Sequence, residues 1–229
     1  SLVLSDIVYN DKKYKIEKAY EIRYLNFFIM CNKWKSYDLI NKKRLFCNKD
    51  PYVFYTKLND ILYISISGTV YNKQFFEYLN GFFEKISEIN DYCDGDYYYH
   101  SKFLEYFRRV KDLILEIVDK NNKKKIVISG HSVGGSVAIL AALILKLKYP
   151  NKIVDFYSFG APSGCCNNLK LLINNTLSKC LNFRNKKDLV PKLVPNIICK
   201  NVGKIIILND DELDEFAEYK DIYFYHKTR

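Results

Sequence analysis

The sequence predicts an α/β fold, a mostly parallel central sheet with helices on both faces, formed by residues 1–229 as a single domain. Short apolar runs typical of strands and longer runs with helical spacing follow one another along the chain. Between Lys125 and Leu147, a strand, a glycine-rich turn and a helix follow in direct succession. The length of 229 residues, 48% of them hydrophobic, suits one domain with a sizeable core.

In the first half of the chain, Ile16–Cys31 has apolar residues at helical spacing, which predicts a helix packed on a sheet face. Tyr52–Tyr55 and Ile61–Ile66 flank a turn signal and are typical of a β-hairpin. The aromatic residues of Asn72–Ile89 also have helical spacing. They indicate either a core helix or a mobile lid over an apolar pocket.

The second half alternates between the two kinds of element. His100–Val118 carries a regular apolar stripe and predicts a long amphipathic helix. Pro150 ends the helix that follows the glycine-rich turn. The further expected elements are a strand over Ile153–Phe159, a helix over Leu169–Leu177, a short strand over Cys180–Phe183, and a closing hairpin formed by Ile197–Cys199 and Lys204–Leu208.

The glycine-rich turn has the pattern of a nucleophile elbow. Gly130-x-Ser132-x-Gly134 lies between the buried strand-like run Ile126–Ile128 and a run of good helix formers. A turn this tight strains the serine backbone and leaves no room for side chains two residues away. The alternatives are a plain glycine turn and a phosphate-binding loop, but the Lys-Ser/Thr of the latter is missing. We therefore interpret Ser132 as a candidate nucleophile.

A serine nucleophile needs a general base. Of the three histidines, His131 lies inside the elbow, where its side chain must diverge from that of Ser132, and His100 precedes the elbow. In α/β-hydrolases the triad residues follow in the chain order Ser, acid, His. That order leaves His226 as the predicted base.

The base in turn needs a carboxylate to orient it. Asp155 opens a predicted strand, which is the wrong end of a parallel sheet for an active site. The Asp residues from Asp210 to Asp221 lie in a stretch that resembles a solvated acidic segment. Asp188 follows a predicted strand end directly and is the predicted acid.

The net charge of +10 has three readings: nucleic-acid binding, attraction to anionic lipid, or a solvated basic exterior that reflects codon bias. The lysines are scattered and no nucleic-acid motif occurs, which favours the solvated exterior and predicts no nucleic-acid partner. The longest apolar run, Val137–Leu145, is too short to span a bilayer, so no transmembrane segment is expected. No signal peptide is visible, and with Ser1 as the first residue the compartment is left open.

The seven cysteines, two of them adjacent at Cys165 and Cys166, cannot all pair, although one or two disulfides are possible. Their spacing fits no metal site, and we expect neither a metal ion nor a cofactor.

Five segments carry a recognisable pattern between about Ile61 and His226: Ser67–Thr69, His100–Phe103, Ser129–Ala138, Ser158–Pro162 and Asp188–Pro191. In this order they resemble the motifs of the class 3 lipases, a family of fungal-lipase-like α/β-hydrolases. Two positions depart from the family pattern: Ser67 stands where the family has Arg, and Lys102 where it has Gly.

The resemblance implies hydrolysis of lipid esters by Ser132, His226 and Asp188. It also implies an oxyanion hole made by the Val133 and Thr69 N–H groups and a lid over about Val70–Leu79. The implied substrate is a lipid or other ester, with peripheral contact to a lipid interface and no cofactor. Two further enzymatic readings, phospholipase A1 and short-chain esterase, stay open. So does a reading of another class, an inactive lipase-like scaffold that serves as a binding module.

Overall fold

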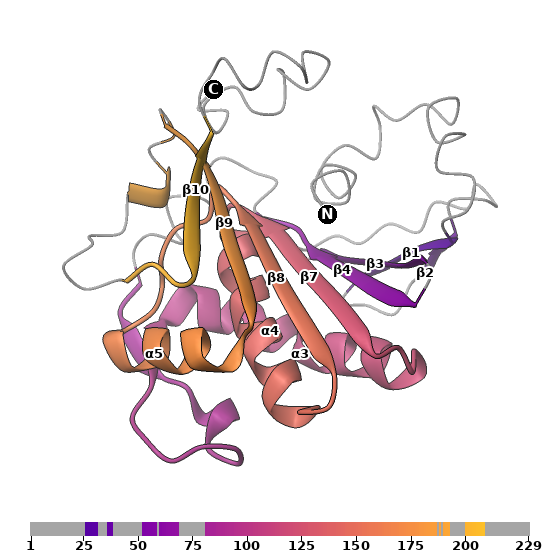
Figure 1. Ribbon diagram of the computed structural model, residues 1–229, viewed down its shortest axis with the longest axis horizontal. Coiled ribbons are helices and arrows are strands. Elements are labelled where there is room, and N and C mark those ends of the chain that lie inside the picture. Colours follow the sequence, from indigo (N-terminus) through magenta and orange to yellow (C-terminus); the bar gives the residue numbers. More distant parts are fainter. Residues whose placement is uncertain are drawn as a thin grey trace.

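The computed structural model describes residues 26–31, 36–38, 52–58, 60–68, 81–186, 188, 190–192 and 200–208. Its centre is an eight-stranded sheet with the strand order β10-β9-β8-β7-β4-β3-β1-β2 (Figure 1). The strands are β1 (Asn26–Cys31), β2 (Ser36–Asp38), β3 (Tyr52–Leu58), β4 (Ile61–Ile66), β7 (Lys125–His131), β8 (Ile153–Phe159), β9 (Lys179–Asn185) and β10 (Lys204–Leu208).

In this sheet β4, β7, β8, β9 and β10 are parallel to one another, whereas β3, β1 and β2 extend it beyond β4 by antiparallel pairing. The predicted α/β class with a mostly parallel sheet is confirmed. The hairpin predicted around residues 58–60 is also present, with β3 and β4 paired in antiparallel register from Val53–Ile66 to Leu58–Ile61.

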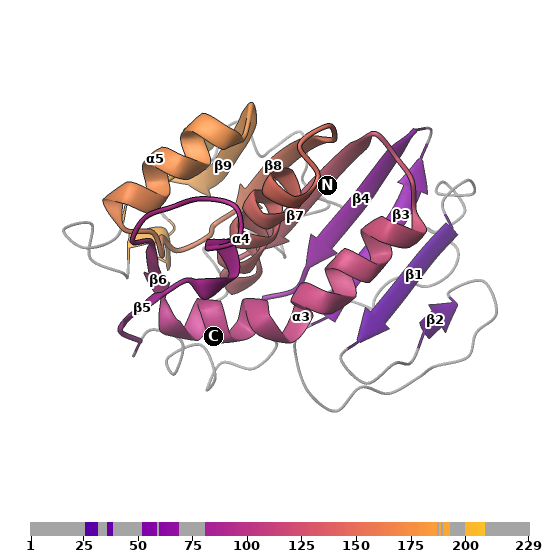
Figure 2. The same ribbon diagram turned by 90° about the horizontal axis from the view of Figure 1, so that it is seen from below.

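The three described α-helices are α3 (Ser101–Lys120), α4 (Val133–Lys148) and α5 (Asn167–Thr176). From β4 through β7 and β8 to β9, each parallel strand is added on the same side of the previous one. Right-handed crossovers that move in one direction place their helices on the same face of the sheet. The two views accordingly show α3, α4 and α5 together on one face (Figures 1 and 2).

The central helix α4 is apolar all round because it is enclosed on all sides: every residue from Val133 to Leu145 is buried between the sheet and the neighbouring helices. Helix α3 is amphipathic, as predicted, and turns a continuous stripe toward α4 and β3. Asn121 caps the carboxyl end of this helix, and its side-chain amide donates to the Ile117 carbonyl at 2.6 Å. The buried residues of the stripe include Phe103, Phe107, Val110, Ile114 and Ile117.

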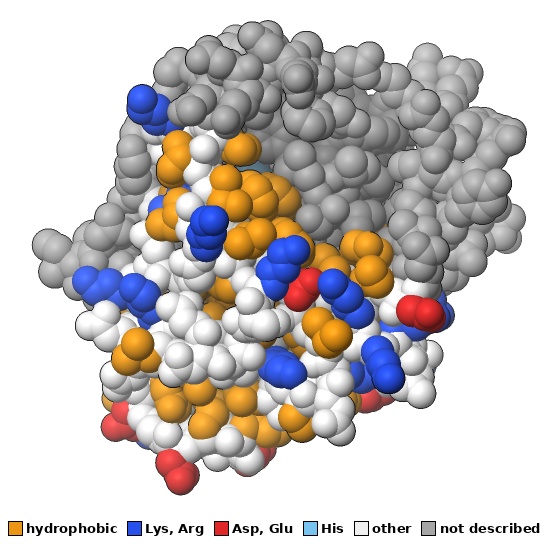
Figure 3. All heavy atoms as spheres, in the orientation of Figure 1, with side chains coloured by type: hydrophobic (Ala, Val, Ile, Leu, Met, Phe, Trp, Pro, Cys, Tyr) orange, Lys and Arg blue, Asp and Glu red, His pale blue; other side chains and the backbone are white. Residues whose placement is uncertain are grey.

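The opposite face of the sheet is turned toward the viewer in Figure 3. Hydrophobic side chains gather there over the carboxyl-terminal parts of β9 and β10, with lysines around them. At the carboxyl ends of β8 and β9, the rings of Phe159 and Phe183 stack with their centroids 5.3 Å apart. None of the described α-helices lies on this face, so the described residues show helices on one face of the sheet and not on both as expected.

The helix predicted over Ile16–Cys31 is wrong for its last six residues, which form β1 and pair with β3. The segment Phe27–Cys31 is a continuous apolar run, and such a run fits a buried strand as well as a helix. The other residues of that prediction lie outside the described part of the chain.

Of the two interpretations of Asn72–Ile89, the core helix is wrong over the described residues 81–89. Phe83–Lys85 forms strand β5, which pairs with β6 (Tyr98–His100), and Ser87–Ile89 forms the 3-10 turn η2. This pairing between distant segments overrides a helical spacing of apolar residues. Residues 69–80, including the lid expected over Val70–Leu79, lie outside the described residues.

Lys204–Leu208, one half of the expected closing hairpin, forms strand β10, which runs parallel to β9 from Lys204–Leu181 to Leu208–Asn185. Ile197–Cys199, the other half of that prediction, is not among the described residues. The helices and strands predicted over residues 100–118, 153–159, 169–177 and 180–183 are all confirmed within a few residues.

Among the cysteines in the described ranges, Cys93, Cys166 and Cys180 are free thiols. Burial raises the pKa of the Cys180 thiol to about 12, which keeps that thiol protonated near neutral pH. The described residues contain no cluster of potential metal ligands. They also contain no helix with the length and apolar character needed to cross a membrane.

Candidate active site

Ser132 occupies a sharp turn between the end of β7 at His131 and the start of α4 at Val133. Its backbone has φ 54° and ψ −132°, and no other described non-glycine residue has a positive φ. Such a conformation costs on the order of 1–3 kcal/mol and persists only where the surroundings enforce it. The Ser132 N–H donates to the Phe159 carbonyl at 2.9 Å, and the Ser132 carbonyl accepts from Gly135 N–H at 2.9 Å. The turn is therefore the strained elbow that the sequence predicts.

The two outer glycines of the motif are required by close backbone approach. A Cβ placed on Gly130 would lie 2.3 Å from the carbonyl carbon and oxygen of Gly134. A Cβ on Gly134 would lie 2.3 Å from the Ile66 carbonyl oxygen and 2.6 Å from the carbonyl group of Ser67. The elbow thus contacts the carboxyl end of β4 directly, without intervening side chains.

We expect the substitution Gly134→Ala to lower the free energy of unfolding by about 3 kcal/mol or more, because its methyl group meets backbone atoms that cannot rotate away. Chemical denaturation measures this change. Gly95→Ala is the matched control: Gly95 has a positive φ of 137°, but the atoms within reach of its Cβ belong to the Tyr97 ring at 3.0 Å or more. Its expected cost is about 1 kcal/mol. Equal costs at the two positions would contradict the close approach at Gly134.

The candidate residues lie at one edge of the sheet. Because β4, β7, β8 and β9 are parallel, the segments that follow them emerge at the same edge. These segments hold Ser67 and Gly68 after β4, Ser132 after β7, and Asp188 after β9. Val133 is the first residue of α4, so its backbone N–H is at the helix N-terminus beside Ser132. Thr69 and His226 lie outside the described residues.

Asp188 is 5% exposed and is held in a tight turn. Its N–H donates to the Asn185 carbonyl at 3.1 Å, and its Oδ1 accepts from Val190 N–H at 2.9 Å. This local side-chain-to-backbone bond fixes the direction of the carboxylate. Arg184 lies close by in β9. Burial lowers the pKa of its guanidinium, and the negative charge of Asp188 partly offsets that decrease.

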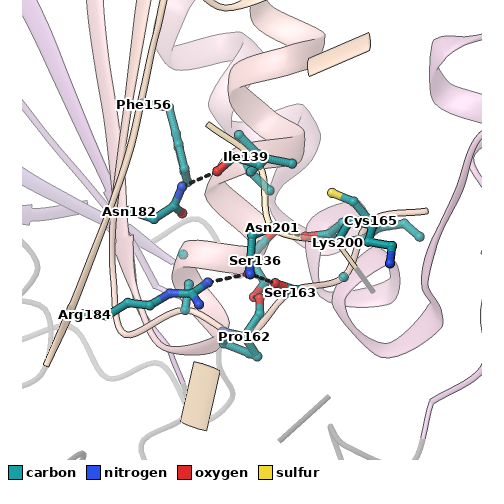
Figure 4. A pocket seen from close by; sticks show the side chains of 15 residues that line it. Ser136, Ile139, Phe156, Pro162, Ser163, Cys165, Asn182, Arg184, Lys200 and Asn201 are labelled. Carbon is teal, nitrogen blue, oxygen red and sulfur yellow. Dashed lines mark hydrogen bonds between the residues drawn. The ribbon is translucent and has the colours of Figure 1, made fainter. Parts of the chain in front are cut away.

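A small cavity lies behind this edge, lined by polar and apolar residues of α4, β9 and the segment after β8 (Figure 4). Its volume of ≈ 20 Å³ has room for about one water molecule. Arg184 Nη2 donates to Asn201 Oδ1 at 2.5 Å, Ser163 Oγ bonds the same oxygen, and Ser136 Oγ donates to the Pro162 carbonyl at 2.7 Å. The cavity is too small for an acyl chain and forms part of the support beneath the elbow helix.

The two other histidines and Asp155, which were weighed as members of the triad, have positions in the structure that do not suit that role. His100 is 2% exposed, and its ring stacks on Phe103 with the centroids 4.4 Å apart. His131 is half-buried at the end of β7. Asp155, near the amino end of β8, is buried and pairs with Lys125 at 2.9 Å. Its position at the opposite end of the strands agrees with its exclusion as the catalytic acid.

The sequence reasoning did not single out Tyr106 or Arg184. Tyr106 lies on the buried side of α3 and bonds the carbonyl oxygens of Ser67 and Gly68. Its signal in the sequence is a tyrosine among core residues, since a buried phenol hydroxyl almost always needs a polar partner. Arg184 directly follows the strand predicted over Cys180–Phe183 and precedes Asp188 by four residues, and this position beside the predicted acid is its signal in the sequence.

Solved structures with a similar fold are lipases at low sequence identity. A lipase from Rhizopus microsporus var. chinensis has a TM-score of 0.68 and 16% identity over 90% of this chain and 71% of its own. A Rhizomucor miehei lipase in a propeptide complex has a TM-score of 0.62 and 20% identity, covering 71% of this chain and 52% of its own. A triacylglycerol lipase described as having a serine protease triad at its catalytic centre has a TM-score of 0.60 and 20% identity, covering 69% and 62%.

The chain thus spans about half to two thirds of the length of several lipases that it matches. These identities establish the α/β-hydrolase fold alone. A comparison with curated protein sequences found no match. The model of the family Lipase (class 3) matches residues 63–197, which is more than half of the chain and includes the end of β4, the elbow and the Asp188 turn. The chain therefore belongs to the class 3 lipase family.

Proposed function

We propose that this protein is a serine hydrolase that cleaves carboxylic esters of lipids through an acyl-enzyme on Ser132, and that residues 1–229 form a single catalytic domain. The observation that carries the proposal is the strained backbone of Ser132 at the start of α4. Strain of this kind clusters at functional sites, because a relaxed turn would not lift the hydroxyl clear of the sheet.

In the proposed reaction, Ser132 Oγ attacks the ester carbonyl carbon while His226 takes its proton. The tetrahedral intermediate then collapses, and His226 returns that proton to the leaving alcohol. Water, deprotonated by His226, attacks the acyl carbon of the acyl-enzyme. The bond to Ser132 Oγ then breaks, His226 returns the proton to Ser132 Oγ, and the carboxylic acid leaves. Asp188 accepts a hydrogen bond from His226 and stabilises the imidazolium that forms in both halves of the reaction.

The negative charge on the intermediate's oxygen is balanced by the backbone N–H groups of Val133 and Thr69. One donor of this kind typically lowers the barrier by about 3 kcal/mol. The close approach of Gly134 to Ile66 and Ser67 supports this pairing, because it brings the segment before Thr69 against the first turn of α4. The steps use only residues of this chain and water.

Lipid substrates are favoured by family membership and by the similar triacylglycerol lipase with a serine protease triad. Such substrates imply peripheral contact with a lipid interface. Phospholipase A1 and short-chain esterase activities use the same chemistry and differ in the head group and acyl length that the site accepts. An inactive lipase-like scaffold is the alternative of a different class.

Hydrolysis of p-nitrophenyl esters from short to long acyl chains tests the proposal, together with labelling by a fluorophosphonate probe. We expect the probe to label the wild-type protein and to leave Ser132→Ala unlabelled. Hydrolysis of long-chain esters that increases when an interface is present indicates a lipase, and hydrolysis confined to short chains indicates an esterase. A folded wild-type protein that neither reacts with the probe nor cleaves p-nitrophenyl esters or phospholipids overturns the proposal in favour of the scaffold.

A further inference from the structure

Ser136, in the first turns of α4, is bonded to parts of the chain outside that helix through both its hydroxyl and its carbonyl group. Its Oγ donates to the Pro162 carbonyl at 2.7 Å, and its own carbonyl accepts from the Tyr99 hydroxyl at 2.6 Å. Ser136 is 2% exposed, so both bonds lie in the interior, where a hydrogen bond is stronger than in water. Ser136 and Pro162 both line the small cavity of Figure 4.

The segment after β8 bonds the elbow at two points. Phe159 ends β8, and its carbonyl accepts from the Ser132 N–H at 2.9 Å. Pro162 follows in the same segment, and its carbonyl accepts from the Ser136 hydroxyl. Ser132 and Ser136 are about one helical turn apart. A single short segment therefore holds the residue before the helix and the first turn of the helix itself.

These two contacts lie on either side of the strained bonds of Ser132. The peptide unit before its Cα is held through its N–H by the end of β8. The peptide unit after its Cα belongs to the start of α4, where its carbonyl accepts from Gly135 N–H at 2.9 Å. Each unit is planar, so φ and ψ of Ser132 set the angle between them. The strained values of 54° and −132° persist only while the start of α4 is held in place against β8.

Close packing and the hydrogen bond contribute to this hold in different ways. A Cβ on Gly135 would lie 2.7 Å from Ala161 Cβ, so α4 already packs tightly against the segment after β8. Such packing resists further approach of the two parts but has little directional preference. Relaxation of Ser132 reorients its two peptide planes and moves the start of α4 relative to β8. The bond between Ser136 and Pro162 is directional and opposes that movement.

We propose that Ser136 is a positioning residue for the nucleophile: by bonding the Pro162 carbonyl, its hydroxyl holds the first turn of α4 so that Ser132 keeps its strained backbone. The consequence for catalysis rests on the proposed ester hydrolysis. Ser136 acts through the backbone and does not contact the substrate, so its removal affects kcat and leaves KM nearly unchanged.

Ser158 offers a matched control. It is 1% exposed, lies in β8, and donates its hydroxyl to Asn182 Oδ1 at 2.5 Å. The variants Ser136→Ala and Ser158→Ala each remove one buried serine hydroxyl. The first hydroxyl joins α4 to the segment after β8, whereas the second joins β8 to β9. Alanine is the best helix former, so Ser136→Ala is expected to fold.

The first measurement is the coupling between Ser136 and the strain at Ser132. Chemical denaturation gives the unfolding equilibrium constant with and without Ser132→Gly in three backgrounds: wild type, Ser136→Ala and Ser158→Ala. We expect Ser132→Gly to lower this constant about 5-fold in the wild-type and Ser158→Ala backgrounds, because it relieves the strain. In the Ser136→Ala background, where the start of α4 can relax, we expect a change of less than about 2-fold.

The second measurement is kcat and KM for p-nitrophenyl butyrate. We expect Ser136→Ala to lower kcat about 10-fold with KM within about 2-fold, because a small displacement of a reacting group is costly. Ser158→Ala is expected to change each constant by less than about 2-fold. An equal effect of Ser132→Gly in all three backgrounds overturns the inference, and so does a wild-type kcat in Ser136→Ala.

These outcomes are distinct from failure of the proposed function, in which the wild-type protein lacks hydrolysis that depends on Ser132. The unfolding measurements do not depend on activity. In that case they still support or overturn the role of Ser136 in holding the strained elbow, while its role in catalysis falls with the proposed function.

Discussion

Replacing Ser132 by glycine is expected to stabilise the protein and abolish ester hydrolysis in one step. At φ 54° and ψ −132°, the serine backbone is in a region that glycine populates readily and other residues rarely enter. Glycine relieves strain on the order of 1–3 kcal/mol, and its greater freedom in the unfolded chain returns about 0.5–1 kcal/mol of that gain. We expect a net increase of about 1 kcal/mol in the free energy of unfolding, measured by chemical denaturation.

Ser132→Ala is the control, because it removes the same hydroxyl and retains the strain. Both variants are expected to lose about 10⁶-fold in kcat, as in a serine hydrolase without its nucleophile. Only the glycine variant is expected to be more stable than the wild type. If the two variants have the same stability, strain is not stored at Ser132. If both hydrolyse esters as the wild type does, Ser132 is not the nucleophile.

The elbow could be predicted from the sequence because the structure that strains Ser132 is formed by residues close to it in the chain. The constraint is local: a sharp turn, two glycines within two residues of the serine, a strand before it and a helix after it. Each part has its own sequence signal, so Gly130, Ser132 and Gly134 were predicted together. Helix α3 was predictable for the same reason, since its buried stripe repeats regularly from Phe103 to Val118.

Features that depend on distant parts of the chain were not predictable. The Phe27–Cys31 run is apolar without a period, so its assignment to a strand depends on pairing with β3. The parallel pairing of β10 with β9 likewise depends on where the chain returns to the sheet. Within the candidate site, the Tyr106 contact joins residues 38 and 39 positions apart. No local pattern encodes such a contact, although a tyrosine in a core stripe indicates that a polar partner exists.

Asp188 is the residue for which folding and catalysis can be separated most cleanly. One carboxylate oxygen, Oδ1, accepts the Val190 N–H at 2.9 Å and thereby holds the turn. In the proposed triad the carboxylate also accepts a hydrogen bond from the imidazole of His226. Asparagine at this position can keep the carbonyl oxygen of its amide on Val190, but its NH2 group donates where the imidazole requires an acceptor.

We therefore expect Asp188→Asn to fold with a melting temperature close to that of the wild type and to lose about 10⁴-fold in kcat, because the imidazole is held in the wrong tautomer. Steady-state hydrolysis of p-nitrophenyl butyrate measures the loss, and thermal denaturation measures the fold.

Asp155→Asn is the control and is expected to have the opposite effect, with lower stability and a nearly unchanged kcat. Asp155 is a buried carboxylate that pairs with Lys125 at the amino end of the strands, away from the elbow. Removing its charge breaks the ion pair between this buried carboxylate and the partly exposed Lys125, which is expected to lower stability. The kcat per folded molecule is expected to stay within about 2-fold of the wild-type value. If Asp188→Asn retains wild-type kcat, another carboxylate orients the base. If both variants lose activity only as they unfold, Asp188 has a structural role alone.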